Sequence, residues 1–220
     1  MASPLPLDPA ELTARIAEGE GTRTEFKRGL PRPEKVARTL AAFANTRGGL
    51  FLVGVGDRGE ILGAPKPPET LAELEAIAAE RVEPPLELRL GTLELGGRPV
   101  IVAAVARSAA RPHAAILDDG EREVTVRLGS STRAADARAL ASLRDRDGGG
   151  SLSDLERRAV AWVAAQGDVG TEAQGRATSD AFARSANIGR SRSRRLFVKL
   201  ERAGHLVGVG AGARRCFSVP

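Results

Sequence analysis

Ionisable side chains that could perform chemistry gather near the start of the chain, in the segment EGTRTEFK (residues 20–27). Glu20 and Glu25 are separated by four residues, Lys27 follows them, and Asp57 comes after the next apolar run. Hard divalent cations bind oxygen ligands, and such a metal can position water and neutralise the leaving oxygen in phosphodiester cleavage. Glu20, Glu25 and Asp57 are therefore candidate ligands for Mg²⁺ or Mn²⁺ and candidate catalytic residues of a nuclease.

The same segment has a simpler interpretation. Alternate side chains of an extended strand share one face, so Arg23, Glu25 and Lys27 would project together while Phe26 enters the core. A carboxylate two residues from an ammonium group then forms a surface ion pair, which contributes less than about 1 kcal/mol to stability. Under this interpretation the acidic residues hold no metal, and no cofactor is expected.

Several later segments extend the pattern that begins with EGTRTEFK. They are AFANTRGG (42–49), LFLVGVGDRGEILG (50–63), Arg111 to His113 in a late strand, and RLGSSTRAAD (127–136). In order and spacing, over roughly residues 11–143, the chain resembles the Schlafen-type AlbA-like domain. The resemblance implies an α/β (α+β) fold and a role in DNA binding.

The resemblance also bears on the acidic residues. In relatives that cleave structured RNA, the acidic site combines two glutamates of this spacing with an aspartate in a later turn. Glu20 and Glu25 match the two glutamates, and Asp57 is the corresponding aspartate. The resemblance therefore keeps two functions open, a DNA-binding regulator and a metal-dependent nuclease.

Gly54, Gly56 and Gly59 satisfy the GxGxxG pattern of dinucleotide-binding proteins. That pattern binds phosphate only where it follows a strand and opens a helix. Here the glycines are followed by Glu-Ile-Leu-Gly and a proline-rich stretch, which favours a turn between two strands. The pattern therefore does not predict a nucleotide site.

Composition limits the other classes. The chain has 220 residues, 42% of them apolar, which is typical of a globular protein, and a single cysteine, which excludes a disulfide framework. No apolar run is long enough to span a bilayer, and the N-terminal segment lacks the features of a secretory signal. We therefore expect a soluble cytoplasmic protein with no membrane partner.

Proline, glycine and apolar spacing divide the chain into two units. Residues 1–144 are expected to form the AlbA-like domain, 145–150 (DRDGGG) a flexible linker and 151–220 a small second domain. In the first unit, helices are expected after Asp8, Pro33 and Pro68 and at 134–143, and strands at 23–27, 50–55, 86–95, 98–106 and 124–128.

The second unit carries the basic excess. Residues 151–220 hold 12 of the 33 Lys and Arg but only 6 of the 28 Asp and Glu. The segment RSRSRRLFVKLERAGHLV (190–207) resembles the recognition helix and wing entry of winged helix-turn-helix proteins. Helical spacing places Leu196, Leu200 and Ala203 inward. The expected nucleic-acid contacts are Arg192, Arg195, Lys199 and Arg202 on the outward face, Ser191 and Ser193 near the helix start, and Arg214 and Arg215 at the wing tip.

These observations predict a nucleic-acid-binding protein, in the first instance a DNA-binding transcriptional regulator with double-stranded DNA as its partner. RNA as a partner and a homodimeric state stay open. A metal-dependent nuclease that uses Glu20, Glu25 and Asp57 is the alternative.

Overall fold

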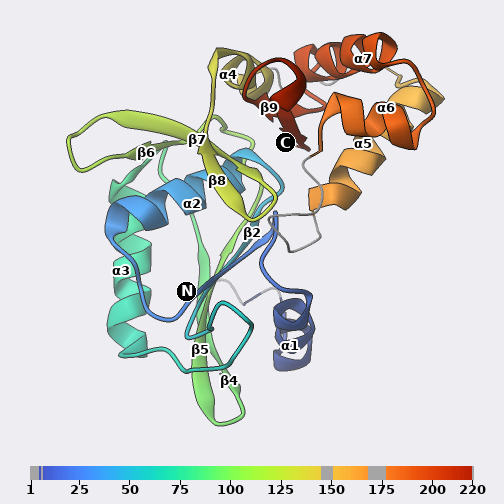
Figure 1. Ribbon diagram of the computed structural model, residues 1–220. Helices are drawn as coiled ribbons and strands as arrows, with labels where there is room; N and C mark the ends of the chain where they lie inside the picture. Colours follow the sequence, from blue (N-terminus) through green and yellow to red (C-terminus); the bar gives the residue numbers. More distant parts are fainter. Residues whose placement is uncertain (1–4, 6, 145–150, 168–176, 220) are drawn as a thin grey trace.

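The computed structural model describes residues 5, 7–144, 151–167 and 177–219. It shows an α+β arrangement in which two four-stranded sheets lie on either side of a helix, followed by a small helical unit with a short hairpin (Figure 1). The expected linker at 145–150 lies outside the described residues. Within the described part of the chain, no helix combines the length and the apolar character needed to cross a membrane.

The first sheet has the strand order β1-β2-β5-β4. Its strands are β1 (Thr24–Lys27), β2 (Gly49–Val53), β4 (Arg89–Leu95) and β5 (Arg98–Val105). β1 runs parallel to β2, and the other two pairings are antiparallel. Gly96 and Gly97 form a two-residue hairpin turn between β4 and β5, with φ of +59° and +73°, a region that glycine occupies without strain.

Helices cover both faces of this sheet. α1 (Pro9–Glu18) packs Leu12 and Ile16 against one face, and its start is fixed by a capping box of Asp8 and Glu11. α2 (Pro33–Asn45) and α3 (Pro67–Glu80) cover the other face (Figure 1). Each of these three helices begins at a proline, whose fixed φ suits the first helical turn.

The second sheet has the order β3-β6-β7-β8 and is antiparallel throughout. Its strands are β3 (Val82–Glu83), β6 (Ala114–Ile116), β7 (Arg122–Leu128) and β8 (Ser131–Ala134). It packs on the side of α2 that faces away from the first sheet, so α2 is buried nearly all round and not on one face alone. β7 was expected from the sequence, and the late strand expected at Arg111 to His113 forms directly after those residues, as β6.

Asn45, at the end of α2, ties the second sheet to the helix. Its side chain is fully buried, donates to the carbonyl oxygens of His113 and Thr125 at 2.8 Å each, and accepts from the His113 N–H at 2.7 Å. The His113 ring donates from Nδ1 to the Pro84 carbonyl oxygen at 2.7 Å, and burial lowers the pKa of His113. His113 is therefore almost fully buried at the floor of a cavity of about 960 Å³, and its burial favours the neutral ring.

α4 (Ala137–Arg144) closes the first unit and begins three residues later than the sequence suggested. The reason is that Ser131–Ala134 pairs with β7 as strand β8. Asp136 then caps the helix, accepting from the N–H groups of Arg138 at 3.1 Å and Ala139 at 3.0 Å.

The C-terminal unit contains three helices and a two-stranded hairpin. These elements are α5 (Asp154–Gly167), α6 (Ser179–Ser185), α7 (Arg190–Arg202), β9 (Val207–Val209), a short 3-10 turn (Gly212–Arg214) and β10 (Cys216–Ser218). Its core is aromatic: the Phe182 and Phe197 rings lie 5.5 Å apart, and those of Phe197 and Phe217 lie 4.9 Å apart. Trp162 packs edge-on against Phe182, as expected for a core residue.

Candidate nucleic-acid interface

The acidic residues of the first unit are engaged by cations of the protein itself. Glu25, on β1, places Oε1 2.6 Å from the Lys27 Nζ and Oε2 2.8 Å from the Arg127 Nη1. The Arg127 side chain is only 1% exposed, donates through Nη2 to the Gly21 carbonyl oxygen at 2.6 Å, and stacks 4.9 Å from the centre of the Phe43 ring. Both oxygens of Glu25 are thus held by positive charges.

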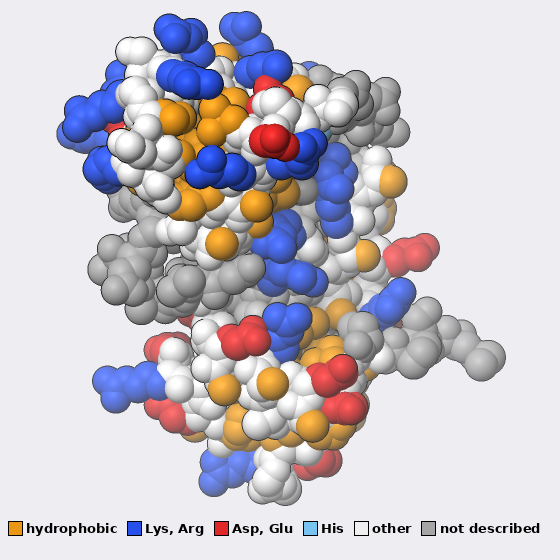
Figure 2. Space-filling model, turned by 90° about the vertical axis from the view of Figure 1, so that its right-hand side faces the viewer, with side chains coloured by type: hydrophobic (Ala, Val, Ile, Leu, Met, Phe, Trp, Pro, Cys, Tyr) orange, Lys and Arg blue, Asp and Glu red, His pale blue; other side chains and the backbone are white. Residues whose placement is uncertain are grey.

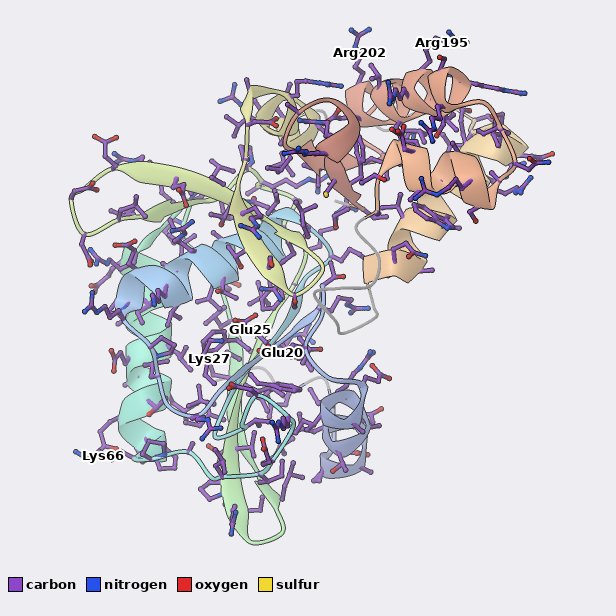
Figure 3. The ribbon with its side chains drawn as sticks, in the orientation of Figure 1. Glu20, Glu25, Lys27, Lys66, Arg195 and Arg202 are labelled. Atoms are coloured by element: carbon purple, nitrogen blue, oxygen red, sulfur yellow. The ribbon has the colours of Figure 1, made fainter. Side chains whose placement is uncertain are left out.

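Glu20 is held by the backbone. Its Oε1 accepts from the N–H of Phe26 at 2.7 Å and lies 4.0 Å from the Lys27 Nζ (Figure 3). Burial raises the pKa of Glu20, and the nearby Glu25 adds to this rise, while the Phe26 hydrogen bond and Lys27 oppose it. This carboxyl group therefore takes up a proton more readily than an ordinary glutamate.

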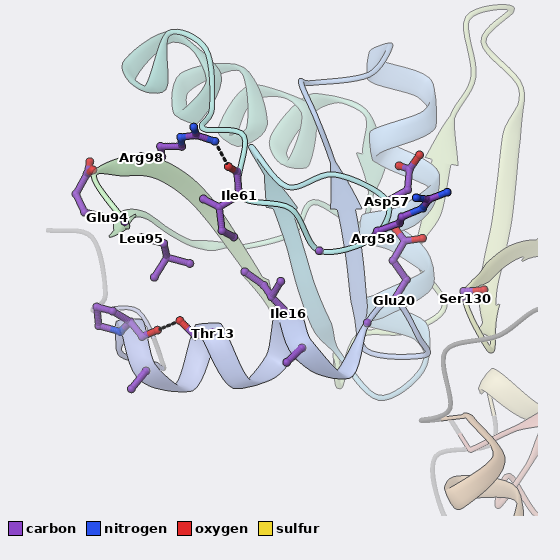
Figure 4. Close-up of a pocket in the computed structure, with 16 residues that line it drawn as sticks. Thr13, Ile16, Glu20, Asp57, Arg58, Ile61, Glu94, Leu95, Arg98 and Ser130 are labelled. Carbon is purple, nitrogen blue, oxygen red and sulfur yellow. Dashed lines mark hydrogen bonds between the residues drawn. The ribbon is translucent and has the colours of Figure 1, made fainter.

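Asp57 lies apart from Glu25. It is exposed at the tip of the turn after β2, where it lines a cavity of about 1080 Å³ together with Glu20, Arg58 and Ser130 (Figure 4). The apolar residues Ile16, Ile61 and Leu95 also line this cavity, but Glu25 does not.

The arrangement does not suit a catalytic metal. Within the described ranges, no group of three or more His, Cys, Asp or Glu side chains is placed to hold a metal ion. A cation at Glu25 would have to displace Lys27 and the buried Arg127, since each already neutralises one carboxylate oxygen. The Mg²⁺ or Mn²⁺ of the nuclease alternative therefore does not fit the residues present.

The glycine-rich segment forms a turn, as predicted. The N–H of Gly56 donates to the Glu60 carbonyl oxygen at 2.8 Å, and the N–H of Gly59 donates to the Gly56 carbonyl oxygen at 2.9 Å. Val55 and Ile61 pair across it as an isolated antiparallel bridge. The next helix begins only at Pro67, so the segment lacks the helix start that a dinucleotide phosphate requires.

The basic stripe of α7, which we define as Arg192, Arg195, Lys199 and Arg202, is exposed along its length. On the opposite side of the helix, Leu196, Phe197 and Leu200 are buried in the aromatic core. Arg195 and Arg202 project from the outer edge of α7, away from the first unit (Figure 3). A groove of about 610 Å³ runs along this side of the helix.

Lys199 differs from the arginines of the stripe because it is paired. Its Nζ lies 2.6 Å from Oε1 of Glu156. Oε2 of Glu156 accepts from the N–H of Ser153 at 2.8 Å, as in a capping box at the start of α5. The Lys199 ammonium and Ser153 lower the pKa of Glu156 to about 2. Lys199 is thus attached to α5, whereas no ion pair is formed within the described ranges by Arg192, Arg195 or Arg202.

Two expected contacts need correction. Ser193 is fully buried, and its hydroxyl donates to the Ser179 carbonyl oxygen at 2.6 Å, so it joins α7 to α6 and is not available to phosphate. Arg215 is 5% exposed and is paired with Glu201 and Asp136. By contrast, Ser191 and Arg214 are exposed, as a phosphate contact requires.

A second row of arginines beside the stripe escaped the sequence reasoning. Arg190 and Arg194 lie one turn apart on α7, and Arg184 lies at the end of α6; all three are exposed. Arg194 forms a two-point pair with Asp180, with both distances at 3.0 Å. The i, i+4 spacing of Arg190 and Arg194 was the available signal. Figure 2 shows Lys and Arg side chains crowded over the C-terminal helices, while Asp and Glu are more frequent lower on this face.

The first unit is an α+β domain of known type. Residues 20–136 match the family model described as Schlafen, AlbA_2. The chain therefore belongs to the Schlafen AlbA_2 family, as the sequence pattern predicted.

No curated protein matches the chain. It is similar to the solution structure of the N-terminal domain of a RecG-related protein, named as a putative ATP-dependent DNA helicase, from Nitrosomonas europaea, with 22% identity, a TM-score of 0.41, and coverage of 53% of this chain and 80% of that one. It is also similar to the DIP2311 protein from Corynebacterium diphtheriae, with 18% identity, a TM-score of 0.44, and coverage of 71% of this chain and 38% of that one.

Proposed function

We propose that the protein is a cytoplasmic DNA-binding transcriptional regulator that reads double-stranded DNA through α7. The observation that carries the proposal is the exposed basic stripe, with three arginines that form no ion pair within the described ranges, on a helix whose other face is buried. Membership of the Schlafen AlbA_2 family supports a nucleic-acid-binding role. α5, α6, α7 and the β9–β10 hairpin would together act as a winged helix-turn-helix unit.

Arginine chemistry supports this assignment. The planar guanidinium group bonds phosphate and the guanine edge in two-point fashion. An α-helix fits the major groove of B-form DNA, where a recognition helix places its outward side chains on base edges and backbone. Arg192 and Arg195, in the first half of α7, would meet base edges, and Arg202 would meet the backbone.

The salt dependence of binding tests the proposal. Each phosphate neutralised adds about −0.9 to the slope of log affinity against log salt. We expect Arg202→Ala to reduce the slope by about that amount over roughly 50 to 200 mM salt, measured by fluorescence anisotropy with duplex DNA. Arg89→Ala, an exposed arginine on β4, is the matched control and should leave the slope unchanged. Equal losses in both variants would reject α7 as the interface.

The same binding measurement with duplex RNA of equal length and sequence tests whether the partner is DNA. The major groove of duplex RNA is too deep and narrow for side chains to read, so we expect α7 to bind RNA more weakly than DNA. If the protein bound the RNA duplex more tightly than the DNA duplex, RNA would replace DNA as the proposed partner.

A further inference from the structure

Arg215 joins three segments that are distant in sequence. From the position just before β10, it donates through Nε to Oε1 of Glu201 at 3.1 Å and through Nη2 to Oδ1 of Asp136 at 3.1 Å. It also donates to the carbonyl oxygens of Gly208 at 2.7 Å and Gly210 at 2.6 Å. Asp136 belongs to the first unit and Glu201 to α7, so a single buried guanidinium connects the two units and the hairpin.

A second arginine completes what we call the Arg215 cluster, namely Asp136, Arg138, Glu201 and Arg215. Arg138, on α4, donates through Nη2 to Oε2 of Glu201 at 2.7 Å. The Glu201 side chain is 2% exposed and lies between two guanidinium groups, so its charge is neutralised from both units. Charged groups of this kind fix geometry strongly, because removal of one partner leaves an uncompensated buried charge.

Apolar contacts surround the Arg215 cluster. Leu143 and Ala139 of α4 and Val126 of β7 pack against Val207 of β9, and all four are buried. The Ser142 hydroxyl adds a hydrogen bond of 2.6 Å to the Leu206 carbonyl oxygen. The β9–β10 hairpin is thus packed against the first unit, with Arg214 as its exposed arginine.

This packing brings a basic helix of the first unit beside α7. α4 contacts both α7 and β9 (Figure 1). It carries Arg138 and Arg144, both exposed at the surface. Because Glu201 lies between Lys199 and Arg202 along α7 but points inward, its pairs with Arg138 and Arg215 set the direction of the basic stripe relative to α4.

We propose that α4 and α7 form one nucleic-acid-binding surface, aligned by the Arg215 cluster, in which Arg144 is a contact residue and Asp136, Glu201 and Arg215 are positioning residues. This inference rests on the proposed function of α7 and extends it to the AlbA-like domain. The β9–β10 hairpin then serves mainly as the docking element between the two units.

Removal of the Asp136 charge distinguishes a positioning role of this residue from a purely electrostatic effect on DNA affinity. Asp136→Asn removes a negative charge close to the DNA, so electrostatics alone would strengthen binding. Loss of alignment would weaken it, and we expect a decrease in affinity of about fivefold or more. The matched control is Asp180→Asn, which removes the same charge at α6 and frees Arg194, and it should strengthen binding.

The experiment uses the full chain and duplex DNA, with affinity measured across a salt series. Arg144→Ala, at an exposed position, should reduce the salt slope by about 0.9 without affecting folding. Asp136→Asn and Arg215→Lys should weaken binding while circular dichroism shows folded protein. Arg215→Lys keeps the charge but loses the two-point geometry.

Two results would overturn the inference: an unchanged slope for Arg144→Ala, or affinity for Asp136→Asn that is equal to or above that of the wild-type protein. If instead the proposed function of α7 is wrong, Arg202→Ala will also leave the slope of log affinity against log salt unchanged, which distinguishes the two failures. An Asp136→Asn variant that does not fold leaves the Arg144→Ala slope to decide the question.

Discussion

Glu25 and Arg127 are 102 residues apart in the sequence, yet the Glu25 Oε2 lies 2.8 Å from the Arg127 Nη1 in a contact that excludes most solvent. This pair joins β1 of the first sheet to β7 of the second. The glutamate that suggested metal chemistry therefore acts in the structure as the counter-ion of a buried arginine.

Glu25→Gln should destabilise the protein substantially. The substitution leaves the Arg127 guanidinium buried and without its carboxylate, and breaking a buried ion pair from one side costs about 3 to 5 kcal/mol. Urea unfolding measures the loss. Glu18→Gln, at an exposed acid on α1 that forms a surface ion pair with Arg15, serves as control and should cost less than about 1 kcal/mol. A near-zero effect of Glu25→Gln would show that the pair is merely a surface contact.

Glu20→Gln should stabilise the protein at neutral pH. Because folding raises the pKa of Glu20, the stability linked to this group is greatest below the ordinary pKa of 4.5 and is lost as the pH rises through the folded-state value. Glutamine mimics the protonated form and can still accept from the Phe26 N–H. The gain, of about 1 kcal/mol or less, should therefore be seen near neutral pH and vanish in acid. The prediction is contradicted if the free energies of unfolding of Glu20→Gln and the wild-type protein differ by the same amount at every pH from acid to neutral.

The acidic residues also give a direct test of the nuclease alternative. We expect no cleavage of structured RNA or single-stranded DNA on addition of Mg²⁺ or Mn²⁺, because the carboxylate oxygens of Glu25 are already paired. Gel assays with and without EDTA measure this. Metal-dependent cleavage that disappears in both Glu20→Gln and Glu25→Gln, with the fold retained, would restore the alternative.

Asn45→Ala should loosen the second sheet. It removes three hydrogen bonds and leaves buried backbone groups of His113 and Thr125 without partners, at a cost of about 3 kcal/mol or more. Hydrogen exchange should increase in β6 and β7 before it does in β2 and β5. Thr39→Ala removes only a bond to the preceding turn of α2 and should have little effect.

The sequence was most informative where structure is decided locally. α1, α2 and α3 follow from a proline at the first turn and apolar residues at helical spacing. β3 and β6 have only two and three residues, and β8 four, so their pairing depends on neighbours that the sequence pattern does not identify. For the same reason Arg127 escaped notice, since its partners Glu25 and Gly21 come from the other end of the domain.

At the candidate interface, the position of each residue around the α7 helix explains which contacts were assigned correctly and why Ser193 was not. Arg192 and Arg195 were assigned to the exposed face of α7 correctly. Ser193 was misassigned although it shares the helical spacing of Leu196 and Leu200, which places it inward. Arg215 follows an exposed Arg214, and it is buried because acidic partners from two other segments surround it.

The separation of Glu25 from Arg127 has a consequence for the order of events during synthesis. A ribosome adds about 5 to 20 residues each second, so Glu25 is made several seconds before its guanidinium partner. Until β7 has left the exit tunnel, β1 can pair with β2 but has only Lys27 to neutralise Glu25. The buried Glu25–Arg127 ion pair, and with it the contact between β1 and β7, can therefore form only after the second half of the domain has been synthesised.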